Sequence, residues 1–269
     1  MNASPPSPRG RQPHTNPLTR TFRDSYVIAV RNLRRMIRTP QLVAFQAVQP
    51  VTFTLLLLYV FGGAIHTPGL RYVDYLLPGI LVQATLFGGG TTTVGIAQDL
   101  SEGMVDRFRS LPMTRPAVLA GRTIADALKN TAVIGLLLAV GTAVGFRFHG
   151  SPLADLAALA LVLAFAYAFS WVFAAIALLV RDPETAQVAG FLPIFPLVFA
   201  SSAFVPTASM PHWLQPFAEH QPISVTVNAT RTLTQGGHIG TLALTSLAWT
   251  LGILLVAAPL ATSRYRRLR

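Results

Sequence analysis

The sequence predicts an all-α integral membrane protein, and three observations carry this prediction. Hydrophobic residues make up 52% of the 269 residues, charged residues only 12%, and the mean hydropathy is +0.50. A soluble domain averages about 25% charged residues, so this chain has too little charge to cover a globule of its size. Six apolar stretches also approach the ~20 residues that cross a bilayer. Composition therefore excludes an ordinary soluble enzyme and a disordered chain.

Each apolar stretch is expected to form one transmembrane helix. Pro193 and Pro196 should bend the fifth of them. Three consecutive glycines, 88–90, lie near the middle of the second and favour close packing against another helix. The six expected spans are 43–63, 73–97, 118–145, 153–180, 187–205 and 241–262.

The segment before the first span divides into two parts. Residues 1–19 contain five prolines and no apolar run, which predicts a disordered cytoplasmic tail. Residues 20–269 are expected to form a single transmembrane domain. Within it, 20–38 carries apolar residues at helical spacing and arginines on another side, which is typical of an amphipathic helix lying in the headgroup region. A solvated basic helix is the alternative.

Basic residues indicate the orientation of the spans. The net charge is +11, and 18 of the 21 basic residues fall on one side of the predicted topology, with Arg71, Arg147 and Arg231 on the other. Lysine and arginine accumulate on the cytoplasmic side of membrane proteins. We therefore expect a multi-pass protein of a bacterial inner or plasma membrane, with both termini in the cytoplasm. Because the charges flank the spans, no nucleic-acid partner is expected.

The second cytoplasmic loop carries an amphipathic pattern over 99–111. An apolar stripe at helical spacing alternates with charges, and Pro112 ends it. The stripe could lie on the bilayer or on its own bundle, or it could dock a soluble partner. The residues of this candidate docking helix are Leu100, Glu102, Met104, Asp106, Arg107, Phe108, Arg109 and Leu111.

Motifs for catalysis are missing from the printed sequence. It has no cysteine, no G-x-S-x-G and no H-E-x-x-H, so no nucleophile and no metal site are predicted. A nucleotide-binding P-loop needs a Gly-Lys-Ser/Thr sequence, whereas Lys129 is the only lysine and stands between Leu128 and Asn130. If this chain takes part in ATP-driven transport, the ATPase is therefore another polypeptide.

Two further polar regions are candidates for function. Arg122, Asp126 and Lys129 lie three and four residues apart at the cytoplasmic end of the third span, and all three can pair on one helix face. A self-neutralised cluster is the simpler interpretation, and a proton relay is the alternative. The outer connection 206–240 predicts short helices at, or dipping into, the outer leaflet, with Trp213 as an interface anchor.

Several short stretches stand out when they are taken together: Asp106–Met113, Gly121-Arg122, Ala125-Asp126, Arg181–Ala186, Phe204–Pro206, Met210–Phe217 and Gln221–Ser224. Together they resemble ABC-2 type permeases, and the match is best with the daunorubicin-resistance (DrrB/DrrC-like) group. The resemblance covers roughly 20–265. It implies a six-span half-transporter in which 20–38 is the elbow helix, 99–111 the coupling helix and 206–240 the outer re-entrant helices.

The same resemblance implies the partners and the function. Two permeases, identical or sister subunits, would pair, and two copies of an ABC ATPase subunit would bind ATP and Mg²⁺; the permease itself would hold no cofactor. The cargo would be amphipathic, such as a drug, an antibiotic or a lipid. The rivals are a lipid or glycolipid exporter of the same family, a proton-coupled secondary transporter and an intramembrane enzyme. Aromatic residues that could line an apolar path, or could simply pack, are Phe53, Tyr59, Phe87, Phe195 and Phe199.

Overall fold

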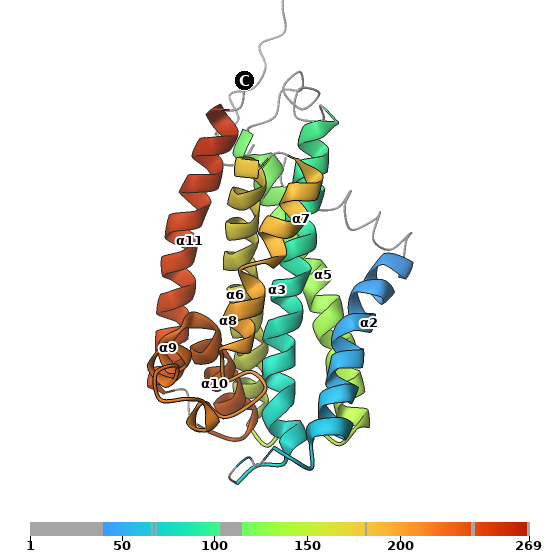
Figure 1. The fold of residues 1–269 in the computed structure, drawn as a ribbon, viewed down its shortest axis with the longest axis vertical. Helices are drawn as coiled ribbons and strands as arrows, with labels where there is room; N and C mark the ends of the chain where they lie inside the picture. Colours follow the sequence, from blue (N-terminus) through green and yellow to red (C-terminus); the bar gives the residue numbers. More distant parts are fainter. Residues whose placement is uncertain are drawn as a thin grey trace, which may run out of the picture.

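The computed structural model describes residues 40–65, 67, 69–102, 115–180, 182–237 and 240–267. Over these ranges the chain forms helices and turns and no strand, and the long helices stand side by side as a bundle (Figure 1). The predicted tail at 1–19, the predicted interfacial helix at 20–38 and residues 103–114 lie outside the described residues.

Four helices in the described part are long and apolar enough to cross a membrane: Tyr72–Ser101, Gly121–Ala143, Pro152–Val180 and Thr241–Tyr265. They match the second, third, fourth and sixth predicted spans. The first predicted span contains a shorter apolar helix, Ala47–Phe61. The elements that carry the bundle are α2 (Pro40–Leu56), the π-helix η1 (Leu57–Phe61), α3 (Tyr72–Ser101), α5 (Arg115–Ala143), α6 (Pro152–Val180) and α11 (Thr241–Arg267).

The fifth predicted span is broken into two helices, α7 (Pro183–Phe191) and α8 (Ile194–Phe199). Asp182 caps α7, and hydrogen bonds from the hydroxyl and the amide of Thr185 lower the pKa of its carboxyl. Proline has no N–H to donate and collides with the preceding turn, so the helix breaks at Pro193. The bend predicted from the two prolines is therefore confirmed.

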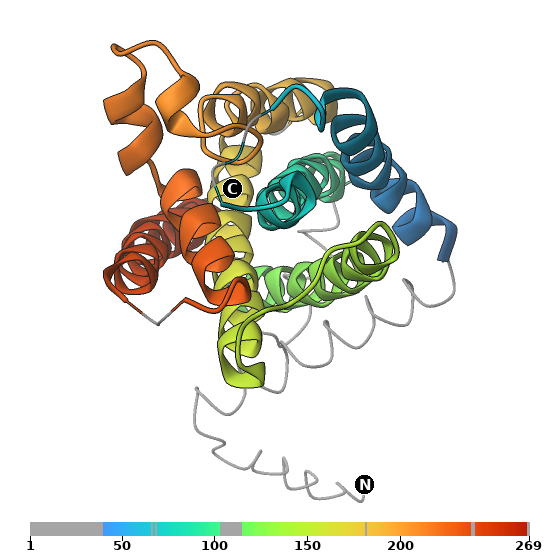
Figure 2. The ribbon, with the colours of Figure 1, turned by 90° about the horizontal axis from the view of Figure 1, so that it is seen from below.

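Helix α3 is the central element of the bundle. Seen from below, the other helices surround it (Figure 2), and 72% of its most apolar window is buried, against 22% for α11. Its leucines and isoleucines form the main hydrophobic core with residues of α5, α6 and α8. Helix α11 instead leaves most of its apolar side chains exposed, as expected of a helix that faces lipid.

Close packing explains the three glycines of α3. A Cβ at Gly89 would lie 2.1 Å from the ring of Phe173, and one at Gly90 would lie 2.9 Å from the ring of Phe191. Both distances are shorter than van der Waals contact, so α6 and α7 approach α3 only because these positions lack a side chain. The close packing predicted from the sequence is confirmed.

The connections separate to opposite ends of the bundle. The turns around 62–71, 144–151 and 200–240 lie at the lower end in Figure 1, and the end of α3, the α6–α7 connection and the end of α11 lie at the upper end. This is the alternation that the predicted topology requires. At the lower end, η2 (Thr207–Ser209) and α9 (Gln215–His220) precede α10 (Pro222–Thr234).

Two boundaries differ from the sequence prediction. Helix α3 continues to Ser101, so Asp99 and Leu100 belong to its last turn and not to a separate coupling helix. No helix breaker stands between Ala97 and Gly103, which explains the longer helix. Helix α10 is buried over most of its length and packs against α3, α6 and α11, so it is more deeply enclosed than a helix on the bilayer surface.

Candidate translocation path and its two ends

Four of the five aromatic residues predicted to line a path come together in space. Phe87 of α3 lies 5.3 Å from Phe195 of α8, and Phe195 stacks on Phe199 at 5.8 Å with nearly parallel rings. Phe199 in turn contacts Phe53 of α2 at 6.4 Å, edge to face. We call Phe53, Phe87, Phe195 and Phe199 the aromatic ladder. It joins three helices that are far apart in the sequence.

Two phenylalanines that the sequence analysis missed extend this ladder. Phe191 lies 6.0 Å from Phe87, and Phe204 lies 5.3 Å from Phe199 and 5.8 Å from Phe53. A signal for one of them was present, because Phe191, Phe195 and Phe199 recur every four residues, the spacing that aligns side chains on one face of a helix, although here the helix breaks after Phe191. Tyr59 is not brought to the ladder, and its side chain is 73% exposed on η1.

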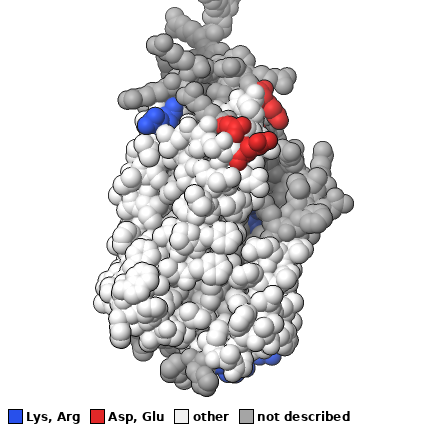
Figure 3. Space-filling model, in the orientation of Figure 1, with Lys and Arg blue, Asp and Glu red and all other residues white. Residues whose placement is uncertain are grey.

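The ladder is open on one side. Phe195 is 50% exposed and Phe199 47% exposed, although both rings also contact other rings. Val188 and Leu192 continue this exposed stripe along α7. Figure 3 shows the same side of the molecule, where charged side chains gather at the two ends and the band between them is almost uncharged. Aromatic faces in an apolar, charge-poor band suit flat apolar groups.

Below the ladder, the chain leaves α8 without forming a helix, and side chains satisfy its backbone. Tyr72 and Tyr75 of α3 donate hydrogen bonds to the carbonyls of Phe204 (3.2 Å) and Ser202 (3.0 Å). Ser224 of α10 accepts one from the Ser202 amide at 3.0 Å. Non-helical backbone at membrane depth is tolerated where protein groups satisfy it. This arrangement fixes segment 200–204 between α3 and α10.

Arg231 of α10 completes this polar contact, and its role was not visible in the sequence. The residue is 8% exposed, and its guanidinium donates to the Tyr75 carbonyl (3.0 Å), the Ser202 carbonyl (2.9 Å) and Asn228 Oδ1 (2.6 Å). Its guanidinium carbon also lies 3.5 Å from the centroid of the Tyr75 ring, a cation–π contact. We call Arg231, Tyr75, Ser202 and Asn228 the outer clasp.

At the opposite end, charged side chains connect α5 to α3. Arg122 forms an ion pair with Asp99 of α3, and not with Asp126, the partner that its spacing on α5 offered. Lys129 pairs with Asp126 at 3.2 Å, as predicted, and lies 3.5 Å from Thr91 of α3. The predicted cluster therefore splits into two ion pairs, because α3 supplies a carboxylate that sequence spacing within α5 cannot reveal.

Two of the predicted docking residues are described by the structure. Leu100 packs against the buried cluster that contains Ile96, Trp171 and Tyr265, and Glu102 is exposed just beyond the end of α3. The remaining ones lie outside the described residues: Met104, Asp106, Arg107, Phe108, Arg109 and Leu111. Their docking role therefore stays a prediction.

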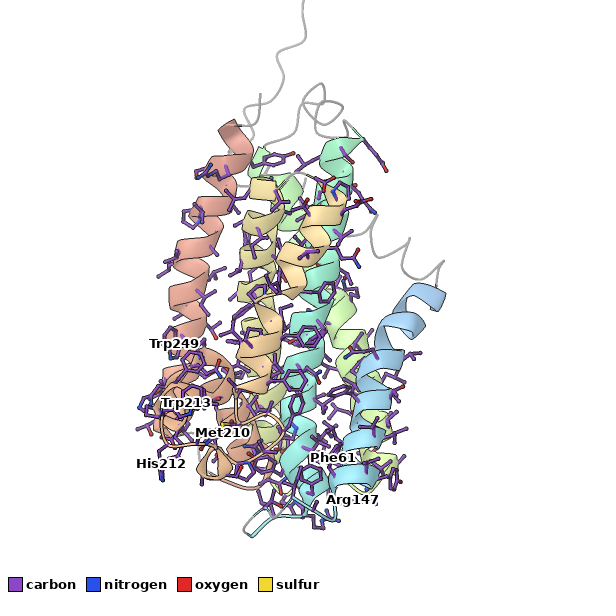
Figure 4. All side chains as sticks on the ribbon, in the orientation of Figure 1. Phe61, Arg147, Met210, His212, Trp213 and Trp249 are labelled. Carbon is purple, nitrogen blue, oxygen red and sulfur yellow. The ribbon has the colours of Figure 1, made fainter. Side chains whose placement is uncertain are left out.

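The lower end of the bundle in Figure 1, which the predicted topology places outside, presents aromatic and polar side chains to the surroundings. Figure 4 places Met210, His212 and Trp213 on the loop before α9, with Arg147 and Phe61 at the same end of the bundle. Trp213 is highly exposed. An exposed indole beside an apolar band is typical of the membrane–water interface, and the anchoring role of Trp213 stays a prediction.

The described helices form a bundle with four helices long and apolar enough to cross a membrane, a charge-poor band and an exposed aromatic face. Residues 24–234 match the family of ABC-2 type transporters, and since this is most of the chain, the chain belongs to that family. The ABC-2 permeases of this family are membrane components of transporters and are not catalytic themselves. The membership predicted from the sequence motifs is thereby confirmed.

Relatives within the family carry drug-resistance names. The chain is 32% identical to the daunorubicin resistance ABC transporter permease protein DrrB1 of Streptomyces coeruleorubidus over 225 residues, which cover 81% of this chain and 77% of the relative. It is 30% identical to a probable doxorubicin resistance ABC transporter permease protein, DrrC, of Mycobacterium tuberculosis over 243 residues, or 88% and 86% of the two chains.

Proposed function

We propose that this chain is the permease subunit of an ATP-driven exporter that moves amphipathic aromatic molecules out of the cytoplasm or the inner leaflet. The aromatic ladder is the single observation that carries the proposal. Phe195 and Phe199 are about half exposed in an almost uncharged band, and ring faces bind flat apolar cargo by stacking. The relatives named for daunorubicin and doxorubicin resistance point to the same class of cargo.

The complete transporter contains further subunits in this proposal. A second permease, identical or a sister chain, covers the exposed stripe of Val188, Leu192, Phe195 and Phe199, so that the ladder faces a path between the two. Two copies of an ABC ATPase subunit bind ATP and Mg²⁺ and dock on 99–111. Both termini and this docking helix lie in the cytoplasm, six spans cross the membrane, and α9 and α10 form the re-entrant outer segment.

In this proposal the permease alternates between an inward-open and an outward-open state, and ATP changes the populations of the two. ATP binding closes the ATPase dimer and pushes on the docking helix, which favours the outward-open state. In this proposal α8, which lies between two breaks in the helix, is the segment of the path that moves between the two states. The permease performs no chemistry itself.

Efflux from intact cells tests this function. Cells that express the chain with its ATPase should accumulate less daunorubicin than cells with either subunit alone, and ATP depletion should abolish the difference. Unchanged accumulation would contradict the proposal. Outward movement of a fluorescent phospholipid without drug efflux would favour the lipid exporter, and loss of efflux with an uncoupler at normal ATP would favour a proton-coupled transporter.

A further inference from the structure

Gln83 is a buried amide without partners in the middle of the central helix. It lies on α3, is 1% exposed, and neither Oε1 nor Nε2 makes a hydrogen bond. A buried amide that makes no hydrogen bond destabilises the fold. An apolar residue of similar size would remove this penalty, so the packing of the bundle gives no reason for a glutamine here.

Other buried polar side chains of α3, unlike Gln83, have hydrogen-bond partners. The hydroxyl of Thr85 donates to the carbonyl of Val82 at 2.7 Å, and that of Thr93 donates to the carbonyl of Phe173 at 3.4 Å. Tyr75 also has a partner, in the outer clasp. Gln83 is the one side chain of α3 with buried polar atoms left unpartnered.

Helix geometry shows which neighbour Gln83 faces. Gly79, Gln83 and Phe87 are spaced by four residues and therefore share one face of α3. A Cβ at Gly79 would lie 2.1 Å from the carbonyl oxygen of Ala203, and Phe87 contacts Phe195. The chain from Phe195 to Ala203 thus runs antiparallel along this face. Gln83 lies between these two contacts on the same face of α3.

Helix spacing therefore places Gln83 on the face of α3 along which α8 runs. Phe195 and Phe199 of the ladder are about half exposed on α8, whereas Gln83 is 1% exposed. Since α8 has only six residues and ends at a break on both sides, a shift of this short helix would open the amide to the same space that the rings face.

We infer that Gln83 is a specificity-determining residue of the export path, which hydrogen-bonds a neutral polar group of an aromatic cargo. This inference rests on the proposed function. The amide donates through Nε2 and accepts through Oε1, so it fits a hydroxyl or a carbonyl group on a ring system that lies against Phe195 and Phe199. A cargo without such groups leaves the amide unpartnered and gains nothing from it.

The test compares two aromatic probes on the purified permease–ATPase complex. Daunorubicin carries hydroxyl and carbonyl groups on a flat ring system, and tetraphenylphosphonium carries rings and no such group. Binding of each probe and the apparent melting temperature are measured for wild type, Gln83→Leu and the control Thr85→Val. Thr85 is buried on the same helix and its hydroxyl contacts only its own turn.

The Gln83→Leu complex should bind daunorubicin about tenfold more weakly, the effect of one lost hydrogen bond, and bind tetraphenylphosphonium as wild type does. It should also melt at a higher temperature, because the unpartnered amide is gone. Thr85→Val should leave the preference between the probes unchanged.

Equal daunorubicin binding by wild type and Gln83→Leu would overturn the inference and leave the proposed function intact. A lower melting temperature with equal loss of both probes would show a structural role and overturn it as well. The variant Gln83→Asn, which keeps a shorter amide, should bind daunorubicin better than Gln83→Leu; the same weak binding by both would argue against recognition by the amide. A wild-type complex that binds neither probe would overturn the proposed function and this inference together.

Discussion

Arg231 illustrates how a single cation is accommodated inside an apolar bundle. Its guanidinium has five N–H groups in a planar fork, and the outer clasp offers carbonyls from two segments, an amide oxygen and a ring face. A lysine would present a compact charge that meets fewer of these acceptors. The residue therefore connects α10, α3 and the non-helical segment at 202.

Removing this guanidinium should weaken the fold. Arg231→Met removes the three hydrogen bonds that Arg231 donates to the carbonyls of Tyr75 and Ser202 and to Asn228, and hydrogen bonds from a charged group contribute about 1.5–3 kcal/mol each. We expect the apparent melting temperature in detergent to fall by roughly 5 °C or more. Arg264→Met is the matched control, since Arg264 is exposed on α11. Equal melting temperatures of the two variants would contradict the role given to the clasp.

At the residue scale, the sequence identified several residues of interest but did not predict which residues they contact. It placed Arg231 among three basic residues expected on the outer side, and it did not reveal that the residue is buried in a contact between helices. Its partners Tyr75 and Ser202 are 156 and 29 residues away. Likewise Arg122 pairs with Asp99 on another helix. Spacing rules describe neighbours within one helix, and contacts between helices depend on the packing of the whole bundle.

At the element scale, α3 owes its central position to small residues at its contacts. Gly79 faces the backbone of Ala203, and Gly89 faces the ring of Phe173. Gly135 of α5, in contrast, has open space around the position of a Cβ. Two glycines in transmembrane helices thus have opposite surroundings, which allows a direct comparison.

The same substitution should have opposite effects at these two glycines. Gly79→Ala places a methyl group 2.1 Å from a backbone oxygen, which cannot move away as a flexible side chain could. Overpacking of this kind costs about 1–3 kcal/mol or more. Gly135→Ala should be neutral or stabilise the helix by up to about 1 kcal/mol. Thermal unfolding of the two variants in one detergent decides the matter, and a stable Gly79→Ala protein would refute the close approach.

The coupling helix can be tested as an element too, although Phe108 lies outside the described residues. The Phe108→Ala variant removes the largest apolar side chain of the docking stripe, which at an interface hot spot costs about 2 kcal/mol or more. We expect normal insertion and about a thirtyfold weaker association with the ATPase, measured by co-purification. Phe217→Ala is the control, because Phe217 is 50% exposed at the outer end. Full association of Phe108→Ala would place the stripe on the bilayer instead.

At the scale of the whole molecule, hydropathy and helix breakers predicted the order of the helices, but not every boundary, since α3 continues to Ser101. Long apolar runs gave α3, α5, α6 and α11, and two prolines foretold the break between α7 and α8. Four residues of the aromatic ladder were predicted as candidates because they are aromatic, but their contacts with one another were not predicted. Nothing in the sequence says that Phe53, Phe87 and Phe199 meet, since they come from three different helices. Tyr59 has the same chemical character, yet it lies on η1 away from them.

ATP-dependent drug uptake into inside-out vesicles tests most directly whether the ladder lines an export path. The permease–ATPase complex is compared with complexes that carry Phe199→Ala or the control Leu255→Ala. Both side chains are exposed, Phe199 by 47% and Leu255 by 72%. Leu255 belongs to α11, a helix that carries no residue of the aromatic ladder, and it is therefore the control. We expect ATP-driven daunorubicin uptake to fall about tenfold or more in Phe199→Ala with ATPase association unchanged, and to persist in Leu255→Ala. Equal uptake by wild type and Phe199→Ala, or uptake that continues without ATP, would contradict the account.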